Sequence, residues 1–269
     1  MDDAQAGLPR DSWASGENYE AYVGRWSKQV AGRFIEWLAI APGRDWLDVG
    51  CGTGAVTRTI VALREPRRVV AVDQSEAFLR FALAATDDER VSFQPGDAQD
   101  LPFDADAFDV AVSGLVLNFV SEPERMAREM ARVVRPGGVI ALYVWDYAGE
   151  MQMMRHFWDA VRETDPASDL DEGRRFPIAN LAALRELFGC VGLRQIDTNV
   201  IDIPTVFTNF DDYWRPFLGG TGPAPVYVQS LSDAARLDLC EALRRRLPVQ
   251  PGGTISLIAR ALAIRAKVT

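Results

Sequence analysis

The feature that most constrains this chain is the segment "DVGCGTG" (48–54), in which three glycines fall within five positions. It follows the apolar run "DWL" and precedes "AVTRTIVAL", which has the spacing of a helix. Glycine adopts backbone angles that other residues avoid, and its missing Cβ lets a ligand approach the backbone closely. A strand, a glycine-rich turn and a helix in this order indicate an α/β unit that binds a ligand at the turn.

Short β-rich runs alternate with helical patterns around this turn. Such alternation predicts a parallel sheet covered by helices on both faces. One helix is expected to open with a capping box of Ser121 and Glu124, with Pro123 in its first turn. The predicted strands are 44–49, 67–73, 90–94, 108–114 and 138–145, and the predicted helices between them are 54–65, 75–85 and 121–134.

An amphipathic helix precedes the glycine segment. Apolar residues recur every four positions between Asn18 and Ile40, which places them on one helix face. These residues are Tyr22, Trp26, Val30, Phe34 and Leu38. The second half of the chain is less regular. Its patterns predict a helix over 180–192, a strand over 193–203, mostly helical structure over 205–250 and a long closing strand over 253–267.

Charge and cysteine content exclude several classes of protein. The formal net charge of −9 argues against the broad basic face of nucleic-acid binders, and the basic run "LRRRL" (243–247) is interpreted as a solvated helix face. Cys51, Cys190 and Cys240 are widely spaced, so neither a disulfide framework nor a metal site is expected. No apolar run approaches the ~18 residues of a membrane span. Residues 1–17 lack the apolar core of a secretory signal and are expected to be flexible, so we predict a cytoplasmic protein without nucleic-acid or membrane partners.

Carboxylates end the first three predicted strands. Asp48 ends the first strand, Asp73 ends the second, and Asp97 follows the third in "PGDAQDLPF". The carboxyl ends of parallel strands meet at one edge of a sheet, where α/β folds bind ligands. A carboxylate in the position of Asp73 can accept both hydroxyls of a ribose, so a nucleoside is expected. This set of carboxylates would repel a pyrophosphate but would suit a positively charged nucleoside, such as a sulfonium with a nearby ammonium.

In their order these motifs resemble the class I S-adenosylmethionine-dependent methyltransferases. The matching segments are "WLDVGCGTG", "VVAVDQS", "GDAQDLPFDADAFDVAVS" and "RVVRPGGVIAL", within roughly 20–147. The chain is similar to the small-molecule branch that includes the ubiquinone and menaquinone C-methyltransferases. The resemblance implies a Rossmann-like α/β fold with a seven-stranded, mostly parallel sheet, helices on both faces, and an inserted, mainly helical substrate cap. It implies S-adenosylmethionine as the cofactor and S-adenosylhomocysteine as the product.

The resemblance also implies how the chain is divided and which residues bind the methionine part and the ribose. One methyltransferase domain would span 18–269, with a cofactor core at about 40–147 and cap segments at about 147–180 and 205–250. The backbone of Gly50, Gly52 and Gly54 would border the methionine part. Asp48 would bind its amino group, often through water, and Asp73 would hold the ribose hydroxyls.

The adenine and the sulfonium would have their own neighbours. Gln74 would lie against the adenine, Asp97 would accept its amino group, and Ala98 would lie next to the ring. Ser113, at the end of the fourth predicted strand, would line the methionine and sulfonium side. Alternatively, Asp48 and Asp73 could be helix-capping or turn residues. Asp97 could be a turn residue, and Ser113 could be a small residue at the end of a strand.

A pair of residues before the first strand completes the implied site. Tyr22 and Arg25 in "YVGRW" would cover the cofactor, as a Tyr/Arg pair does in similar proteins. The alternative for Tyr22 is a core position in its own helix.

The acceptor pocket is expected in the chain added to the cofactor core, because that chain is rich in aromatic side chains. Trp145 and Tyr147 are best placed to contact an acceptor, and Asn118 lies where a polar group could reach it. Alternatively, most of the aromatic residues form the added region's own core and Asn118 is a turn residue. The segment "SGLVLNFV" lacks the N/D-P-P-Y sequence of nucleic-acid amino-methyltransferases of this fold. A small, aromatic or apolar metabolite is therefore the expected acceptor.

The chemistry of a sulfonium methyl donor limits what the protein must supply. Its methyl group is a strong electrophile with a neutral leaving group, so an SN2 transfer needs in-line placement and exclusion of water. Catalytic residues are therefore not assigned, apart from His156 as a candidate base, since a single imidazole could deprotonate a phenol or an enol.

Two other functions stay open. Gly50-x-Gly52-x-x-Ala55 fits a relaxed dinucleotide fingerprint, so an NAD-type oxidoreductase is one alternative. A module that binds the cofactor without transferring a methyl group is the other. No motif encodes the acceptor atom, the pathway or the oligomeric state.

Overall fold

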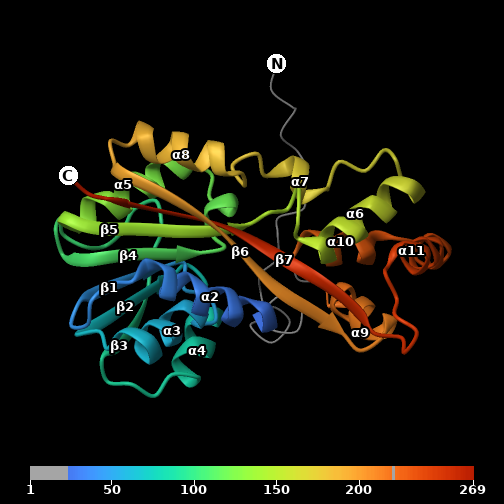
Figure 1. Ribbon diagram of the computed structural model, residues 1–269, viewed down its shortest axis with the longest axis horizontal. Coiled ribbons are helices and arrows are strands. Elements are labelled where there is room, and N and C mark those ends of the chain that lie inside the picture. Colours follow the sequence, from blue (N-terminus) through green and yellow to red (C-terminus); the bar gives the residue numbers. More distant parts are fainter. Residues whose placement is uncertain (1–23, 220–221) are drawn as a thin grey trace.

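The computed structural model describes residues 24–219 and 222–269. The expected flexible segment 1–17 and the predicted contact of Tyr22 lie outside these residues. The described chain forms a seven-stranded sheet in the order β3-β2-β1-β4-β5-β7-β6 (Figure 1). The strands are β1 (Asp45–Val49), β2 (Arg68–Asp73), β3 (Val91–Pro95), β4 (Phe108–Gly114), β5 (Val134–Trp145), β6 (Arg194–Phe207) and β7 (Ile255–Lys267).

The sheet is mixed but mostly parallel. Strands β3, β2, β1, β4 and β5 run parallel to their neighbours, whereas β7 lies between β5 and β6 and is antiparallel to both. The predicted Rossmann-like class and the long closing strand are confirmed. All residues of β1 are buried, as expected for a parallel strand that is covered on both faces.

Helices cover the two faces of the sheet in separate groups (Figure 1). Helices α2 (Arg25–Leu38), α3 (Ala55–Arg64) and α4 (Glu76–Ala84) pack on one face, and α5 (Pro123–Val133) and α8 (Leu181–Cys190) pack on the other. This arrangement leaves the carboxyl ends of the parallel strands as an edge that side chains from several loops can reach.

The amphipathic spacing before the glycine segment is confirmed for the described part of that helix. Trp26, Val30, Phe34 and Leu38 are all buried on the face of α2 that packs against α3, β6 and β7. Burial of an apolar side chain of this size contributes about 1.5–3 kcal/mol. The spacing therefore fixes how α2 lies on the sheet.

The predicted capping box at the start of α5 is wrong. Glu122 occupies the N-cap position without a capping hydrogen bond from its side chain. Ser121 instead donates to Gln99 Oε1 at 3.0 Å, and the Glu122 amide donates to the same oxygen at 2.7 Å. A side chain from a distant loop thus does the capping, which local sequence could not indicate. Pro123 stands at the first turn as expected.

A second group of helices follows β5 and surrounds the far ends of β6 and β7, at the right of Figure 1. We call this group the cap; its helices are α6 (Gln152–Thr164), α7 (Glu172–Arg175), α9 (Phe210–Trp214), η3 (Arg215–Leu218), α10 (Pro223–Ser230) and α11 (Asp233–Arg246). Its aromatic rings mostly pack on one another. Phe157 and Phe217 stack with ring centroids 4.5 Å apart, and both side chains are fully buried. These aromatic residues were interpreted either as an acceptor pocket or as the core of the added region. For most of them the second interpretation is correct.

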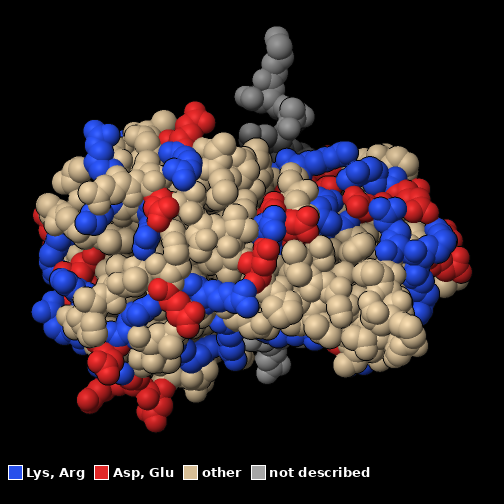
Figure 2. Space-filling view, in the orientation of Figure 1, with Lys and Arg blue, Asp and Glu red and all other residues tan. Residues whose placement is uncertain are grey.

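Charges of both signs are interspersed on the face of the molecule that Figure 2 shows. Arg245 and Arg246 of the basic run lie on α11 and pair with α6, at 2.7 Å from Glu163 and 3.3 Å from Asp159. The interpretation of this run as a solvated helix face is confirmed. Within residues 24–219 and 222–269, no helix is both long and apolar enough to cross a membrane.

Candidate functional site

The glycine segment forms a tight turn between β1 and α3. Gly50, Gly52 and Gly54 have φ angles of +70°, +52° and +81°, in the left-handed region that favours glycine. The amides of Gly50 and Cys51 donate to the Val72 carbonyl at 2.8 and 2.9 Å, which ties the turn to β2. Backbone geometry therefore favours glycine at these three positions.

The space around each glycine differs. A Cβ on Gly50 would lie 2.4 Å from the Val116 side chain, and one on Gly54 would lie 3.2 Å from Ala82 Cβ. A Cβ on Gly52 would meet no atom within 4 Å. Gly52 thus opens onto free space at the carboxyl edge of the sheet, where a ligand could lie against the backbone.

Asp73 ends β2 beside this turn. Its Oδ2 accepts a hydrogen bond from the Gly52 amide and its Oδ1 accepts one from the Ser75 amide, both at 2.8 Å. Each carboxylate oxygen has a further lone pair, so both can still accept a ribose hydroxyl. Burial raises the pKa of Asp73 above its usual value, and hydrogen bonds from the amides of Ser75, Gly52 and Gln74 partly offset this rise.

Asp48 is the penultimate residue of β1, two residues before Gly50, and is only 1% exposed. Its Oδ2 accepts from the Thr57 hydroxyl at 2.6 Å, whereas its Oδ1 is buried without a partner. Burial, with a smaller contribution from the charge on Asp73, raises the pKa of Asp48 to about 7. A buried carboxylate with an unpaired oxygen is suited to a cationic partner such as an ammonium group.

The third carboxylate belongs to a local turn. Asp97 Oδ1 accepts from the Gln99 amide at 2.8 Å, and the Gly96 amide before it donates to the Asp73 carbonyl at 3.2 Å. The loop that carries Asp97 is therefore fixed to the end of β2. Ala98 is buried beside it, and Gln74 is exposed.

Ser113 lies at the end of β4 and is fully buried. Its hydroxyl donates to the Val49 carbonyl at 2.7 Å, next to Gly50. This bond joins β4 to the start of the glycine turn, so Ser113 fixes the position of the turn.

Arg25, at the start of α2, meets the cap. Its Nη1 lies 3.2 Å from Asp212 Oδ1 on α9, and the guanidinium lies 4.5 Å from the ring centroid of Trp26 and 4.8 Å from that of Phe207. Its Nε and Nη2 are buried without a hydrogen-bond partner.

Asn118 lies in the short helix η2 (Leu117–Phe119), just after β4. It is 8% exposed, and neither its amide oxygen nor its amide nitrogen has a partner. Two features fix the loop before it. Leu115 has a φ of +64°, unusual for leucine, and its amide donates to the Tyr143 carbonyl at 2.8 Å. Two residues before Asn118, Val116 fills the space over Gly50.

Trp145 and Tyr147 follow β5 and are 2% and 5% exposed. Tyr147 packs against Phe176 with ring centroids 5.4 Å apart, and Phe176 packs against Phe119 at 5.2 Å. Asn118 is thus next in sequence to an aromatic group formed by three separate segments. Trp145 belongs to the main hydrophobic core at the end of β5.

His156 lies on α6 within the cap and is half-buried. Burial lowers its pKa, and the nearby charge of Arg246 lowers it further, so the imidazole is neutral at pH 7. Asp159, three residues further along α6, pairs with Arg246 of α11 at 3.3 Å, so His156 lies on the side of α6 near α11.

Three side chains that the sequence analysis did not single out help to build this region. Val116 closes the space over Gly50, Gln99 links the Asp97 turn to the start of α5, and Asp212 holds Arg25. Gln99 lies inside the quoted motif "GDAQDLPF", which was the one available signal. Val116 and Asp212 carry no local signal because their contacts join segments far apart in the chain.

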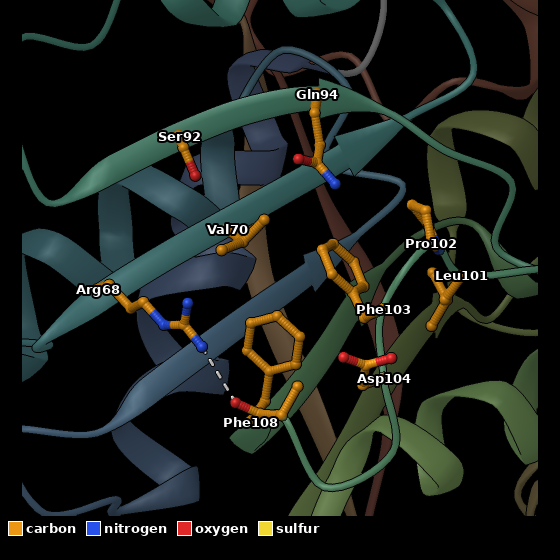
Figure 3. Close-up of a pocket in the computed structure, with 10 residues that line it drawn as sticks. Arg68, Val70, Ser92, Gln94, Leu101, Pro102, Phe103, Asp104 and Phe108 are labelled. Carbon is orange, nitrogen blue, oxygen red and sulfur yellow. Dashed lines mark hydrogen bonds between the residues drawn. The ribbon is translucent and has the colours of Figure 1, made fainter.

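A groove of about 640 Å³ lies elsewhere, over β2, β3 and the start of β4 (Figure 3). All residues between β3 and β4 are described, and they contain no helix. This part of the sheet is therefore left uncovered. Arg68 spans one end, where its Nη2 donates to the Ala107 carbonyl at 3.1 Å. None of the predicted cofactor or acceptor residues lines the groove.

Comparison with known proteins identifies the domain around the glycine turn. Residues 47–142 match a family model described as a methyltransferase domain. This segment of the chain is therefore similar to a methyltransferase domain. The predicted resemblance of this segment to methyltransferases is confirmed.

Relatives of the methyltransferase domain include quinone-modifying proteins. The chain is 35% identical over 132 residues to a demethylmenaquinone methyltransferase of Symbiobacterium thermophilum, covering 45% of this chain and 52% of that protein. It is 40% identical over 96 residues to 2-methyl-6-phytyl-1,4-hydroquinone methyltransferase 2 of Oryza sativa, covering 36% of this chain and 28% of that protein. The chain thus spans about half the length of the first curated relatives it matches, or less.

Solved structures share the fold of this chain. Phosphoethanolamine N-methyltransferase 2 of Haemonchus contortus, in complex with S-adenosyl-L-methionine, superposes with a TM-score of 0.59 at 16% identity, covering 98% of this chain and 61% of that one. The cyclase SpnF superposes with a TM-score of 0.53 at 19% identity, covering 97% and 85%. A fold shared by a methyltransferase and a cyclase does not by itself fix the reaction.

Proposed function

We propose that the protein transfers a methyl group from S-adenosylmethionine to a small, aromatic or apolar metabolite. One observation carries this proposal: Gly52 opens onto free space at the sheet edge where the carboxylates of Asp48 and Asp73 lie. Because carboxylates repel a pyrophosphate and attract a cation, this edge suits a cationic nucleoside better than a dinucleotide.

The residues at the edge fit the parts of this cofactor. The open backbone at Gly52 would border the methionine part, and the unpaired Oδ1 of Asp48 would receive its ammonium group, directly or through water. Asp73 would accept the ribose hydroxyls with the lone pairs that Gly52 and Ser75 leave free. Gln74, Asp97 and Ala98 would surround the adenine, and Tyr22, Arg25, Gly50, Gly54 and Ser113 would complete the proposed site.

The acceptor side would be built around Asn118. Its unpaired amide would bind a polar group of the acceptor, and the rings of Phe119, Tyr147 and Phe176 would pack on an apolar or planar part. Trp145 would support this wall from the core. Quinone-modifying relatives favour an aromatic acceptor. Division of the chain into a cofactor core at about 40–147 and cap segments at about 147–180 and 205–250 is part of the proposal.

Methyl transfer would depend on placement more than on proton transfer. S-adenosylmethionine, when bound, supplies an electrophilic methyl group whose leaving group is neutral. The chain would hold the acceptor in line with that methyl group and keep water out. We therefore assign no catalytic base, and His156 is the one candidate. The net charge of −9 and the three free cysteines favour a small-molecule acceptor and a reducing, cytoplasmic location.

Titration calorimetry tests the cofactor, with S-adenosylhomocysteine and NAD as separate ligands. We expect S-adenosylhomocysteine to bind and NAD not to bind. Binding of NAD alone would establish the oxidoreductase alternative. Labelled S-adenosylmethionine with a panel of phenols, hydroquinones and amines then tests transfer, and cofactor binding without turnover across the panel would favour a module that transfers nothing.

A further inference from the structure

The groove over β2, β3 and the start of β4 has a basic side chain at one end and an acidic side chain at the other (Figure 3). Arg68 lies at the first end. Its side chain is 49% exposed, although its Nε lies 3.5 Å from Asp45 Oδ2. Asp104 lies at the other end and is exposed. Each of these charges can therefore take a partner from outside the groove.

Aromatic rings lie between the two charges (Figure 3). Phe103 and Phe108 pack edge to face with ring centroids 5.0 Å apart, and the Arg68 guanidinium lies 5.2 Å from the ring centroid of Phe108. Ser92 and Gln94 border the groove from β3. A surface with an apolar centre and polar or charged margins is typical of a reversible protein–protein interface.

One wall of the groove is the β3–β4 connection, residues 96–107, and it is fixed to the rest of the fold. Arg132 on α5 donates to the carbonyls of Leu101 and Phe103, at 3.0 and 2.7 Å. The outer residues of this wall are exposed; they are Pro102, Asp104, Ala105 and Asp106. A partner would therefore meet a preformed surface, with side chains available to enter a hollow opposite.

Opposite charges at its two ends make the groove complementary to a copy of itself. A two-fold axis through the middle of the groove places Arg68 of each protomer opposite Asp104 of the other, so two ion pairs form at once. A purely acidic or purely basic partner would satisfy one end and meet a like charge at the other. The charge pattern therefore favours a second copy of this chain as the occupant.

We propose that two copies of the chain associate through this groove, with the β3–β4 connection of each protomer lying in the groove of the other. The charged margins and the small apolar centre indicate a reversible dimer rather than an obligate one. None of the predicted cofactor or acceptor residues lines the groove, so the contact does not depend on the proposed function.

Charge reversal at either end of the groove tests the contact. In a dimer of Arg68→Glu two carboxylates face each other at each pair, and in a dimer of Asp104→Arg two guanidinium groups do. Sedimentation velocity over about 1–200 μM would measure the dissociation constant of the dimer. We expect the wild-type chain to dimerise and each variant to raise the dissociation constant at least about tenfold, because like charges then meet across the interface.

A mixture of the two variants separates loss of the contact from damage to the fold. In a mixed dimer the new glutamate of Arg68→Glu faces the new arginine of Asp104→Arg, and the unchanged Asp104 and Arg68 form the second pair. The mixture should therefore dimerise within about threefold of the wild-type affinity, although each variant alone does so poorly. A contact elsewhere on the molecule could not produce this recovery.

Arg128→Glu is the matched control, because Arg128 is exposed on α5, pairs with Glu124 and does not line the groove. It should leave the dissociation constant unchanged. Thermal denaturation checks that Arg68→Glu folds; Asp45 keeps Arg67 and Arg135 as partners in that variant. If it does not fold, Asp104→Arg alone decides the outcome.

Four results would overturn the inference. They are a monomeric wild-type chain, a dimer that the charge reversals leave intact, a mixture of folded variants that stays monomeric, and equal weakening by Arg128→Glu, which would show an effect of net charge alone.

Discussion

The proposed cofactor and acceptor sites of this molecule are specified in different ways. We use cofactor edge for the proposed cofactor site, the glycine turn with Asp48 and Asp73, and acceptor side for the proposed acceptor site, Asn118 with Phe119, Tyr147 and Phe176. Backbone angles and amide hydrogen bonds within residues 48–75 shape most of the cofactor edge. Packing between distant segments shapes the acceptor side. The first kind of site leaves a local motif in the sequence and the second does not.

The largest loss of cofactor affinity is expected for a change at Gly52, in the cofactor edge. Gly52→Val fills the open space at the turn and forces valine into a left-handed backbone, which costs about 1–3 kcal/mol of stability. We expect S-adenosylhomocysteine affinity to fall at least ~100-fold, because the side chain would occupy the ligand's place. Calorimetry measures the affinity and thermal denaturation measures the stability.

Gly137→Val is the matched control for this change. Gly137 also has a positive φ, of +82°, and no atom within 4 Å of its missing Cβ, but it lies at the opposite end of β5 from the carboxyl edge. It should lose similar stability and keep cofactor affinity. If both variants bind the cofactor equally well, the space at Gly52 is not a ligand site.

Asp73→Ala should have the next largest effect. The loss of two hydrogen bonds to a charged acceptor should weaken cofactor affinity by about 2–3 kcal/mol. Some stability should be lost too, because the amides of Gly52 and Ser75 lose their acceptor. Glu76→Ala removes an equal charge from an exposed position three residues away and should leave calorimetric affinity unchanged. An unchanged affinity in Asp73→Ala would remove Asp73 from the site.

Asn118→Leu tests the acceptor side. Removal of the unpaired buried amide should maintain or raise the melting temperature, whereas the KM of an acceptor found in the panel should rise about tenfold. Affinity for S-adenosylhomocysteine should not change. Thr205→Val is the control, because the Thr205 hydroxyl is also buried and unpartnered, on β6. If Asn118→Leu and Thr205→Val change the KM of the acceptor equally, Asn118 has only a packing role.

The cofactor edge also contains a buried carboxyl group, Asp48, whose pKa is raised. The pKa of Asp48 rises from 3.8 to about 7 in the folded protein, so the native state holds a proton that the unfolded state has released. Stability contributed by this group is therefore complete below pH ~4 and is lost as the pH rises through about 7. Cofactor affinity should change in the opposite direction, because an ammonium group prefers the ionised carboxylate.

Calorimetry between pH 5.5 and 8 should therefore show affinity rising several-fold and levelling above about pH 7. Asp48→Asn should remove most of this dependence, because its amide does not titrate. A pH profile that survives this substitution would have to come from another group. Asp73, whose pKa is also raised, would be the first to examine.

Particular residues show how far sequence could predict this molecule. The strands and helices of the first half follow the expected ranges, because apolar periodicity and glycine turns are local signals. The predicted capping box at Ser121 was wrong because the interaction is not local. Gln99, 22 residues earlier in the chain, accepts the hydrogen bonds of Ser121 and Glu122 at the start of α5. Asp212 was missed for the same reason, because it meets Arg25 across 187 residues of chain.

The smallest effect is expected at His156, the one titratable group of the cap that sequence offered as a catalyst. His156→Ala should leave kcat/KM for the panel acceptor within about threefold, because His156 lies in the cap on the side of α6 that pairs with Arg246 of α11. Its pKa is already lowered by burial, so the variant should not introduce a new dependence on pH near 7. A fall of ~10²-fold or more would instead mark His156 as a general base. That result would contradict the contrast between the two regions. A catalytic residue of the cap would then have been identified from the sequence, because His156 is the only histidine in the chain.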